Sequence, residues 1–184
     1  MRLFFAAIPD RDTCGRLAEA ARALELESDG FSHCVRPQNY HMTLAFVGEA
    51  AETSLAALRA IGAARGGKAS GHAPVAVRFD AYEYWPKAEV VAATASDCPP
   101  AIEELSLAIR GELSRQRLAR DPYPFRPHVT LARKVSQAPV FKALSEIHWA
   151  LREFHLVRSD RSACGSVYTV VDTWQLLDTA SNHR

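Results

Sequence analysis

The sequence predicts an α+β fold in which two lobes of mostly antiparallel sheet with flanking helices surround a central cleft. Helical segments and strand pairs are interspersed along the chain, as in this class. The order of segments also occurs twice, with a period near 87 residues, which predicts an internal duplication and two lobes related by a pseudo-twofold axis. Within the repeat, HMTLA at 41–45 nearly returns as HVTLA at 128–132. Random placement gives about 0.03 copies of H-x-T-L, so chance does not explain two.

The first half of the chain begins with an apolar strand and a helix. RLFFAAI at 2–8 is a short apolar run closed by Pro9, which is typical of a strand. Asp10 or Asp12 caps a helix whose apolar spacing extends to about residue 27. The later elements are a strand at 41–47 that ends at Gly48, a helix through 55–61, and a hairpin of strands 74–85 and 89–95.

The second half repeats this order from residue 97 onward. Asp97 and the prolines that follow it start a helix that continues to Leu113. The later elements are a strand at 128–134, a helix capped by Ser136 that carries Val140, Phe141, Leu144 and Ile147, and strands at 150–159 and 166–177. We therefore expect one two-lobed domain over residues 1–184, with repeat halves at about 10–95 and 97–177.

Composition indicates an ordinary globular protein and limits the kinds of partner. The net charge of +1 does not suggest a protein that binds nucleic acid along its whole surface, although it permits a local basic patch. No two of the four cysteines have C-x-x-C spacing, and MRLFFAAIPD is too short and too quickly acidic for a signal peptide. No apolar run approaches the length of a membrane span. We expect a cytoplasmic monomer with reduced thiols and no membrane association.

The repeated strands place one histidine and one threonine on the same face. Side chains alternate along a strand, so His41 and Thr43 share one face of the first strand, and His128 and Thr130 share one face of the second. Pseudo-twofold symmetry would bring the two pairs together across the cleft. One imidazole could then act as a general base on an incoming hydroxyl while the other acts as a general acid on a leaving oxygen. Threonine hydroxyls could donate hydrogen bonds to an anionic group between them.

The paired histidines have two other interpretations, a structural role and a zinc site. A single strand histidine is more often a packed, hydrogen-bonded residue than a catalyst, but recurrence at symmetric positions favours function. A zinc site usually needs three or four protein ligands, often with a carboxylate or thiolate among them. Neither strand offers Asp, Glu or Cys on its histidine face, so a metal site is not supported.

These motifs resemble those of the two-histidine phosphoesterases, which carry paired H-x-T-x motifs. The sequence is most similar to the bacterial and archaeal RNA 2′,3′-cyclic phosphodiesterases, once called 2′-5′ RNA ligases. Four stretches carry the resemblance: RLFFAAIP at the start, VRPQNYHMTLAFVGE (35–49), PFRPHVTLARK (124–134) and LVRSDRSACGSVYTVVDTWQL (156–176).

The resemblance implies hydrolysis of a 2′,3′-cyclic phosphate at an RNA end to a 2′-phosphomonoester, without metal or cofactor. It implies that His41 is the proton donor and His128 the proton acceptor. Thr43 and Thr130 would hold the phosphate oxygens, and Arg133 would contact phosphate. Strict alternation puts Arg133 on the wrong face of its strand, so we expect the strand to end or bulge there, or the side chain to curl round.

The sequence leaves several points open. Arg126, two residues before His128, either orients substrate or pairs with a surface carboxylate. Aromatic candidates for base stacking are Phe46, Tyr82, Tyr84, Trp85 and Phe125, although most aromatic residues at such positions belong to the core. The enzyme could instead act on other 2′-linked or cyclic nucleotides, including ligation by the reverse reaction. In a further alternative, the cleft only captures RNA ends without catalysis.

Overall fold

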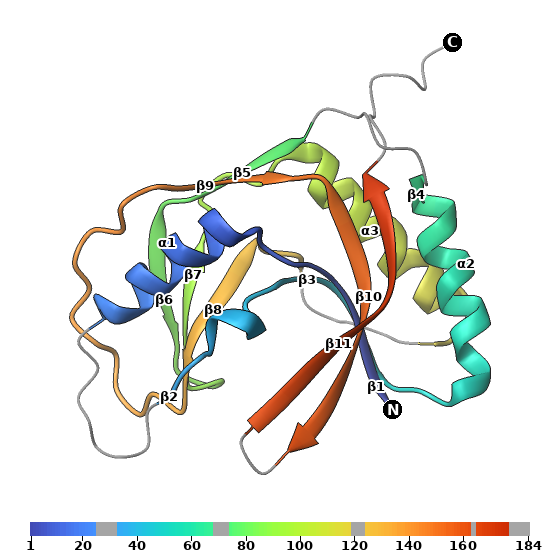
Figure 1. Ribbon diagram of the computed structural model, residues 1–184, viewed down its shortest axis with the longest axis horizontal. Coiled ribbons are helices and arrows are strands. Elements are labelled where there is room, and N and C mark those ends of the chain that lie inside the picture. Colours follow the sequence, from blue (N-terminus) through green and yellow to red (C-terminus); the bar gives the residue numbers. More distant parts are fainter. Residues whose placement is uncertain (25–32, 68–73, 119–123, 163–164, 177–184) are drawn as a thin grey trace.

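The computed structural model describes residues 1–24, 33–67, 74–118, 124–162 and 165–176 (Figure 1). Five strands form the first sheet, in the order β3 (Met42–Glu49), β1 (Arg2–Ala7), β10 (Glu153–Ser162), β11 (Gly165–Leu176) and β4 (Gly66–Gly67). All of its strand pairs are antiparallel. Strands β10 and β11 form a long hairpin that projects from the body of the molecule (Figure 1).

A second sheet carries the second histidine motif. Its four strands are, in order, β2 (His33–Cys34), β8 (His128–Arg133), β7 (Val90–Thr94) and β6 (Ala81–Trp85), again all antiparallel. A separate antiparallel pair is formed by β5 (Val75–Phe79) and β9 (Ile147–Leu151). With three α-helices in the described part of the chain, these sheets confirm the α+β class.

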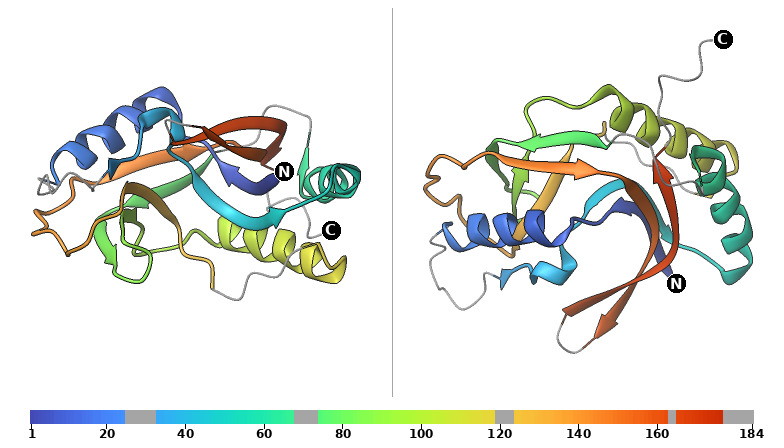
Figure 2. Two further views of the ribbon diagram at one scale, coloured as in Figure 1. Left: turned by 90° about the horizontal axis from the view of Figure 1, so that it is seen from below. Right: turned by 45° about the horizontal axis from the view of Figure 1, so that its top comes forward.

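The helices cover the core side of the sheets. Helix α1 (Arg11–Arg22) begins at Asp10, whose carboxylate accepts the Thr13 backbone N–H at 2.9 Å, and it packs against β8 and β9. Helices α2 (Leu55–Arg65) and α3 (Pro100–Arg115) contact each other at the opposite end of the molecule (Figure 2). Two short 3₁₀ turns, Pro37–Asn39 and Glu52–Ser54, flank β3. The buried apolar side chains of both sheets and all three helices form one main core.

Each sheet combines strands from both halves of the chain. The first sheet takes β3 from the first half and the hairpin β10–β11 from the second, whereas the second sheet takes β8 from the second half and β6–β7 from the first. The two halves of the sequence are therefore not the two sheets. Each histidine strand belongs to a sheet that also contains a strand pair from the other half.

The predicted helix after Ser136 is wrong. The segment 134–146 has no regular secondary structure, and Ile147 instead begins β9. In β9, Ile147, Trp149 and Leu151 are buried while the residues between them are exposed, which is the period of a strand. Before β9, Val140 is 92% exposed, so the apolar residues that suggested a helix do not bury a common face.

The predicted strands 74–85 and 150–159 are each divided by a change of partner. Segment 74–85 forms β5 and β6, which are separated at Asp80, and segment 150–159 spans the end of β9 and most of β10.

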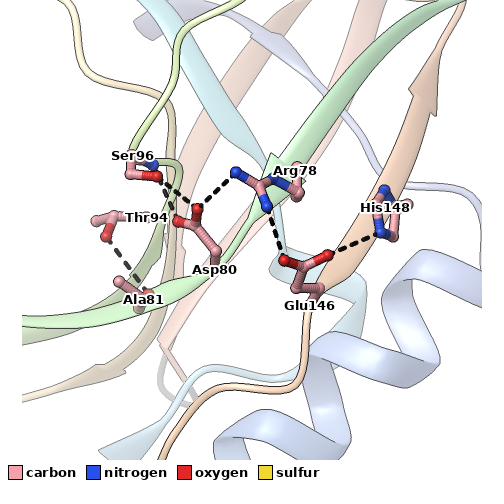
Figure 3. Close-up of polar contacts among 7 residues, drawn as sticks. All are labelled: Arg78, Asp80, Ala81, Thr94, Ser96, Glu146 and His148. Carbon is pink, nitrogen blue, oxygen red and sulfur yellow. Dashed lines mark hydrogen bonds and ion pairs between the residues drawn. The ribbon is translucent and has the colours of Figure 1, made fainter.

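A polar cluster surrounds the break between β5 and β6. Asp80 accepts hydrogen bonds from the backbone N–H and the hydroxyl of Ser96, and Arg78 bridges Asp80 and Glu146 (Figure 3). Glu146 also lies 3.3 Å from the ring of His148. This cluster ties the β5–β9 pair to the segment that follows β7.

Candidate active site

The two histidine strands lie in different sheets but contact each other. His41 directly precedes β3, and His128 is the first residue of β8. The alternate residues Met42, Leu44, Val129 and Leu131 are fully or almost fully buried in the main core. The histidine and threonine of each motif therefore face away from that core, as alternation predicts.

A β-bulge follows the threonine in each motif. In β8 the register passes from Thr130 to Ala132 while β7 advances by one residue, so Leu131 is the extra residue. In β3 the register with β1 passes from Thr43 to Ala45, so Leu44 is the extra residue. A bulge changes which face the following side chains occupy.

The bulges bring two more side chains to the histidine face. Phe46 and Arg133 occupy equivalent positions, 87 residues apart, and both line the same pocket as the histidines. Phe46 is 42% exposed, whereas Ala45 and Ala132 beside them are buried. The bulge at Leu131 thus explains why Arg133 lies on the histidine face of β8, although strict alternation would place it on the opposite face.

The carbonyl groups of both bulge residues have hydrogen-bond partners. The Ser106 hydroxyl in α3 donates to the Leu44 carbonyl at 2.6 Å, and the Val35 N–H donates to the Leu131 carbonyl at 2.8 Å. Buried backbone groups are costly when unpaired. These partners therefore stabilise the bulges that set the geometry of the site.

The histidine faces enclose a pocket of about 320 Å³. Side chains from both sheets and from the β10–β11 hairpin line it: Arg2, Phe4, His41, Thr43, Phe46, Trp85, Ala88, Val90, His128, Thr130, Arg133, Ser159, Ser166 and Tyr168. The lining that the structure describes contains two guanidinium groups, no carboxylate and no thiol. Hydroxyls, imidazoles and guanidinium groups together favour an anionic ligand.

Both histidine rings are held in the same way. His41 Nδ1 lies 2.7 Å from the Asn39 carbonyl oxygen, and His128 Nδ1 lies 2.7 Å from that of Arg126. A carbonyl oxygen only accepts, so each Nδ1 carries the hydrogen and donates it. This leaves Nε2 of each ring as the nitrogen that can exchange a proton with a ligand.

Both imidazoles are neutral near pH 7 when no anion is bound. Burial lowers the pKa of His41 to about 4; the hydrogen bond to Asn39 opposes this, and Arg133 and His128 add to it. Burial also lowers the pKa of His128, as do Arg126 and Arg133, against the hydrogen bond to the Arg126 carbonyl and the charge of Glu83. A phosphate between the rings would act in the opposite direction, because a nearby negative charge favours imidazolium.

Aromatic rings flank each imidazole. The His41 ring lies 5.0 Å between centroids from both Phe4 and Tyr168, and the His128 ring lies 4.7 Å from Trp85. Tyr168 and Trp85 present edge-on contacts, at 80° and 72°. These contacts restrict the rotation of both rings.

Comparison with known proteins identifies the family. Residues 9–163 match the 2′-5′ RNA ligase superfamily. The chain belongs to this superfamily. An RNA 2′,3′-cyclic phosphodiesterase from Thermus thermophilus is 32% identical over 185 residues, which cover 96% of this chain and 90% of that protein.

Solved structures of related proteins share the fold. TT0787 of Thermus thermophilus is 30% identical, with a TM-score of 0.82 over 96% of this chain and 98% of its own. A crystal structure of a phosphoesterase is 26% identical, with a TM-score of 0.84 over the same shares. The superfamily fold therefore spans nearly the whole chain.

The structure brings most of the predicted site residues together. His41, Thr43, His128, Thr130 and Arg133 all line the pocket. Arg126 is not among the lining residues, because its guanidinium pairs with Glu83, the carboxylate alternative that the sequence left open. Among the stacking candidates, Phe46 and Trp85 line the pocket, whereas Tyr82, Tyr84 and Phe125 pack against the main core.

Sequence reasoning missed the contributions of β1 and of the β10–β11 hairpin. Arg2, Ser159, Ser166 and Tyr168 line the pocket although they lie far from both motifs in the sequence. They face it because β1 pairs with β3, β10 pairs with β1 and β11 pairs with β10, with Arg2 opposite Ser159 and Ser159 opposite Tyr168. The alternating pattern of these strands was visible, but the sequence did not show which strands would be neighbours.

The described residues contain no group of three or more His, Cys, Asp or Glu side chains arranged to hold a metal ion. In the same part of the chain, no helix combines the length and apolar character needed to cross a bilayer.

Proposed function

We propose that this protein hydrolyses 2′,3′-cyclic phosphate ends of RNA to 2′-phosphomonoesters without a metal ion. One observation carries the proposal: two histidine–threonine pairs, from different sheets, line one pocket that also holds Arg2 and Arg133. Its Thermus relative, an RNA 2′,3′-cyclic phosphodiesterase, supports this substrate.

The reaction needs one proton removed and one delivered on opposite sides of phosphorus. Water attacks phosphorus, a new P–O bond forms, and the bond from phosphorus to the 3′ oxygen breaks. His128 accepts the proton of the water at Nε2, and His41 donates a proton from Nε2 to the departing 3′ oxygen. This division of roles follows the resemblance of the first and second motifs to those of the two-histidine phosphoesterases.

The remaining polar groups of the pocket stabilise the charged phosphate. Thr43 and Thr130 donate hydrogen bonds to its non-bridging oxygens, and the Arg133 guanidinium balances the charge that develops during displacement. The Nδ1–H bonds to backbone carbonyls keep both Nε2 atoms available for proton transfer.

Substrate binding must also change the protonation of His41. A proton donor must be imidazolium when the reaction begins, yet the pKa of His41 is about 4 when no anion is bound. The cyclic phosphate supplies the negative charge that raises it. In this scheme, the bound substrate raises the pKa of His41, so that its imidazole is protonated and can act as the general acid.

The chemistry of the pocket lining supports metal independence. Catalytic zinc sites combine imidazole with carboxylate or thiolate ligands, or use three histidines. Two histidines with hydroxyls and guanidinium groups do not match either set. Arginine and threonine take over the neutralisation of phosphate charge that a metal would otherwise perform.

The experiment is turnover of an RNA oligonucleotide with a 2′,3′-cyclic end in the presence of EDTA. We expect hydrolysis, with a 2′-phosphate in the product. His41→Ala and His128→Ala should each lower kcat by about 10²–10⁴-fold, the usual contribution of a general acid or base. His148→Ala, an exposed histidine outside the pocket lining, serves as the matched control and should behave as wild type.

Other outcomes would contradict the proposal in different ways. A 3′-phosphate product would place the scissile bond on the other oxygen. Activity that EDTA abolishes would restore the metal hypothesis. No turnover, together with undiminished RNA-end binding in both alanine variants, would favour a module that only captures ends.

A further inference from the structure

The residue two positions before each pocket histidine is anchored through its side chain. Asn39 and Arg126 provide the carbonyl groups that accept the Nδ1–H of His41 and His128. Asn39 Nδ2 donates to the Ser166 carbonyl at 3.0 Å, and the Arg126 guanidinium pairs with Glu83. Each acceptor carbonyl is therefore fixed by a contact made on another strand.

Each anchor lies two residues before the aromatic ring that contacts the same histidine. Ser166 precedes Tyr168, which contacts His41, and Glu83 precedes Trp85, which contacts His128. On the Glu83 side the contacts close into a ring, because Trp85 Nε1 donates to Glu83 Oε2 at 2.8 Å. Glu83 thus contacts both residues that hold the His128 ring: Arg126, whose carbonyl accepts the Nδ1–H, and Trp85, whose indole lies against the ring.

The two arrangements share the position of the carbonyl-bearing residue in the repeat, but not the position of its anchor. Asn39 and Arg126 are 87 residues apart, and the anchors Glu83 and Ser166 are 83 residues apart on β6 and β11. The side chains of Arg126 and Glu83 are 53% and 31% exposed. A surface ion pair of this kind contributes only about 0–1 kcal/mol to stability, so stability alone is a weak reason for it.

We propose that Glu83 is a positioning residue for His128, acting through Arg126 and Trp85, and that Asn39 has the equivalent role for His41. This inference rests on the proposed function, because it assigns His128 as the proton acceptor. Glu83 is not among the pocket-lining residues. It fixes the plane of the imidazole and keeps the hydrogen on Nδ1, so that Nε2 faces the reacting water.

The effect of the Glu83 and Arg126 charges on the pKa of His128 distinguishes a positioning role from a purely structural one. Within the described residues, Glu83 on β6, Arg126 before β8 and Arg133 on β8 act on the pKa of His128, and His41 before β3 also interacts with it. Removing the Glu83 charge leaves the Arg126 guanidinium uncompensated and lowers the pKa of His128 further. Removing the Arg126 charge leaves the Glu83 carboxylate uncompensated and raises that pKa.

The test compares Glu83→Ala, Glu83→Gln and Arg126→Gln by kinetics and by NMR of the His128 ring nitrogens. Glu83→Ala should lower kcat by about 10- to 100-fold, the loss typical for groups that orient a metal-bound histidine, while KM changes little. Glu83→Gln retains an acceptor for Trp85, so it should recover most of kcat, to within about threefold of wild type. The His128 pKa should fall in Glu83→Gln and rise in Arg126→Gln.

Glu146→Ala is the matched control, because Glu146 also pairs with an arginine, but that residue, Arg78, does not supply the carbonyl that holds a pocket histidine. It should leave kcat and the His128 signals unchanged. Wild-type kcat in Glu83→Ala, or His128 pKa shifts in the same direction in both charge variants, would overturn the inference.

The NMR measurement needs no turnover. An inactive wild-type protein would refute the proposed function, while the His128 tautomer and pKa in these variants would still decide whether Glu83 positions the ring.

Discussion

The two pocket imidazoles are kept neutral by their surroundings, and this has a consequence for ligand binding. Burial, Arg133 and the second histidine lower the pKa of His41 to about 4 when no anion is bound. An anion in the pocket raises that value, because it stabilises imidazolium. At pH values between the pKa of His41 in the free protein and its pKa in the bound protein, anion binding must therefore be coupled to the uptake of a proton by His41.

We predict that the affinity for a permanently charged oxyanion rises as the pH falls. Sulfate is a suitable probe because its own charge is constant across this range. Affinity should be lowest above the bound-state pKa of His41 and should increase as the pH falls from there toward about 4. Isothermal titration calorimetry in buffers of different ionisation enthalpy measures the proton uptake directly.

His41→Gln is the control for this prediction. It should remove most of the pH dependence and leave the smaller share that His128 contributes. Affinity that is equal at both ends of the pH range, with no proton taken up in wild type, would contradict the assignment of His41 as the group that responds to the anion.

The elements contribute most through the irregularities of β3 and β8. A regular strand would keep Arg133 and Phe46 off the face that carries the histidines, and the bulges at Leu131 and Leu44 move them onto it. The sequence indicated that Arg133 lies on the wrong face of a regular strand, but it could not decide whether the strand ends, the strand bulges or the side chain curls round. A bulge depends on hydrogen bonds from other elements, and these are known only from the tertiary structure.

Ser106→Ala should destabilise the protein by about 1–3 kcal/mol. The Ser106 side chain is fully buried in α3, and without its hydroxyl the Leu44 carbonyl at the bulge loses its 2.6 Å partner. Ser114→Ala, at an exposed position of the same helix, should stay within about 0.5 kcal/mol of wild type. Urea unfolding at constant m-value measures the difference, and equal stabilities of the two variants would show that the bulge needs no such partner.

The error at residues 136–147 also belongs to this scale. Val140, Phe141, Leu144 and Ile147 fit a helical spacing by count. The apolar alternation of Ile147, Trp149 and Leu151 fits a strand, and it prevails because β5 offers a hydrogen-bonding edge. Local periodicity could not decide between these patterns without the position of that edge.

At the scale of the whole molecule, the two halves of the chain exchange strands. The hairpin β10–β11 of the second half completes the sheet of β3, and β6–β7 of the first half completes the sheet of β8. Each imidazole consequently contacts an aromatic ring supplied by the other half: Tyr168 against His41, and Trp85 against His128. Neither half contains a complete histidine site.

We predict that fragments 1–97 and 98–184 do not fold separately. Each lacks strands of the sheet that contains its own histidine strand and part of the shared core, so each would expose core residues to water. Far-UV circular dichroism and thermal unfolding should show no cooperative transition for either fragment alone. Mixing the fragments should restore the cooperative transition of the intact chain, whereas a cooperative transition in one fragment would contradict the exchange.

The sequence by itself determined the α+β class and the two histidine–threonine pairs that carry the proposed chemistry. These features are local or periodic, so residue types and spacing suffice to reveal them. Tertiary structure alone decided which strands became neighbours, that Arg2 and Tyr168 join the pocket, and that Glu83 holds Arg126. The physical reason is that strand pairing and ion pairing act between residues far apart in the chain, and their partners are chosen by the packing of the whole core.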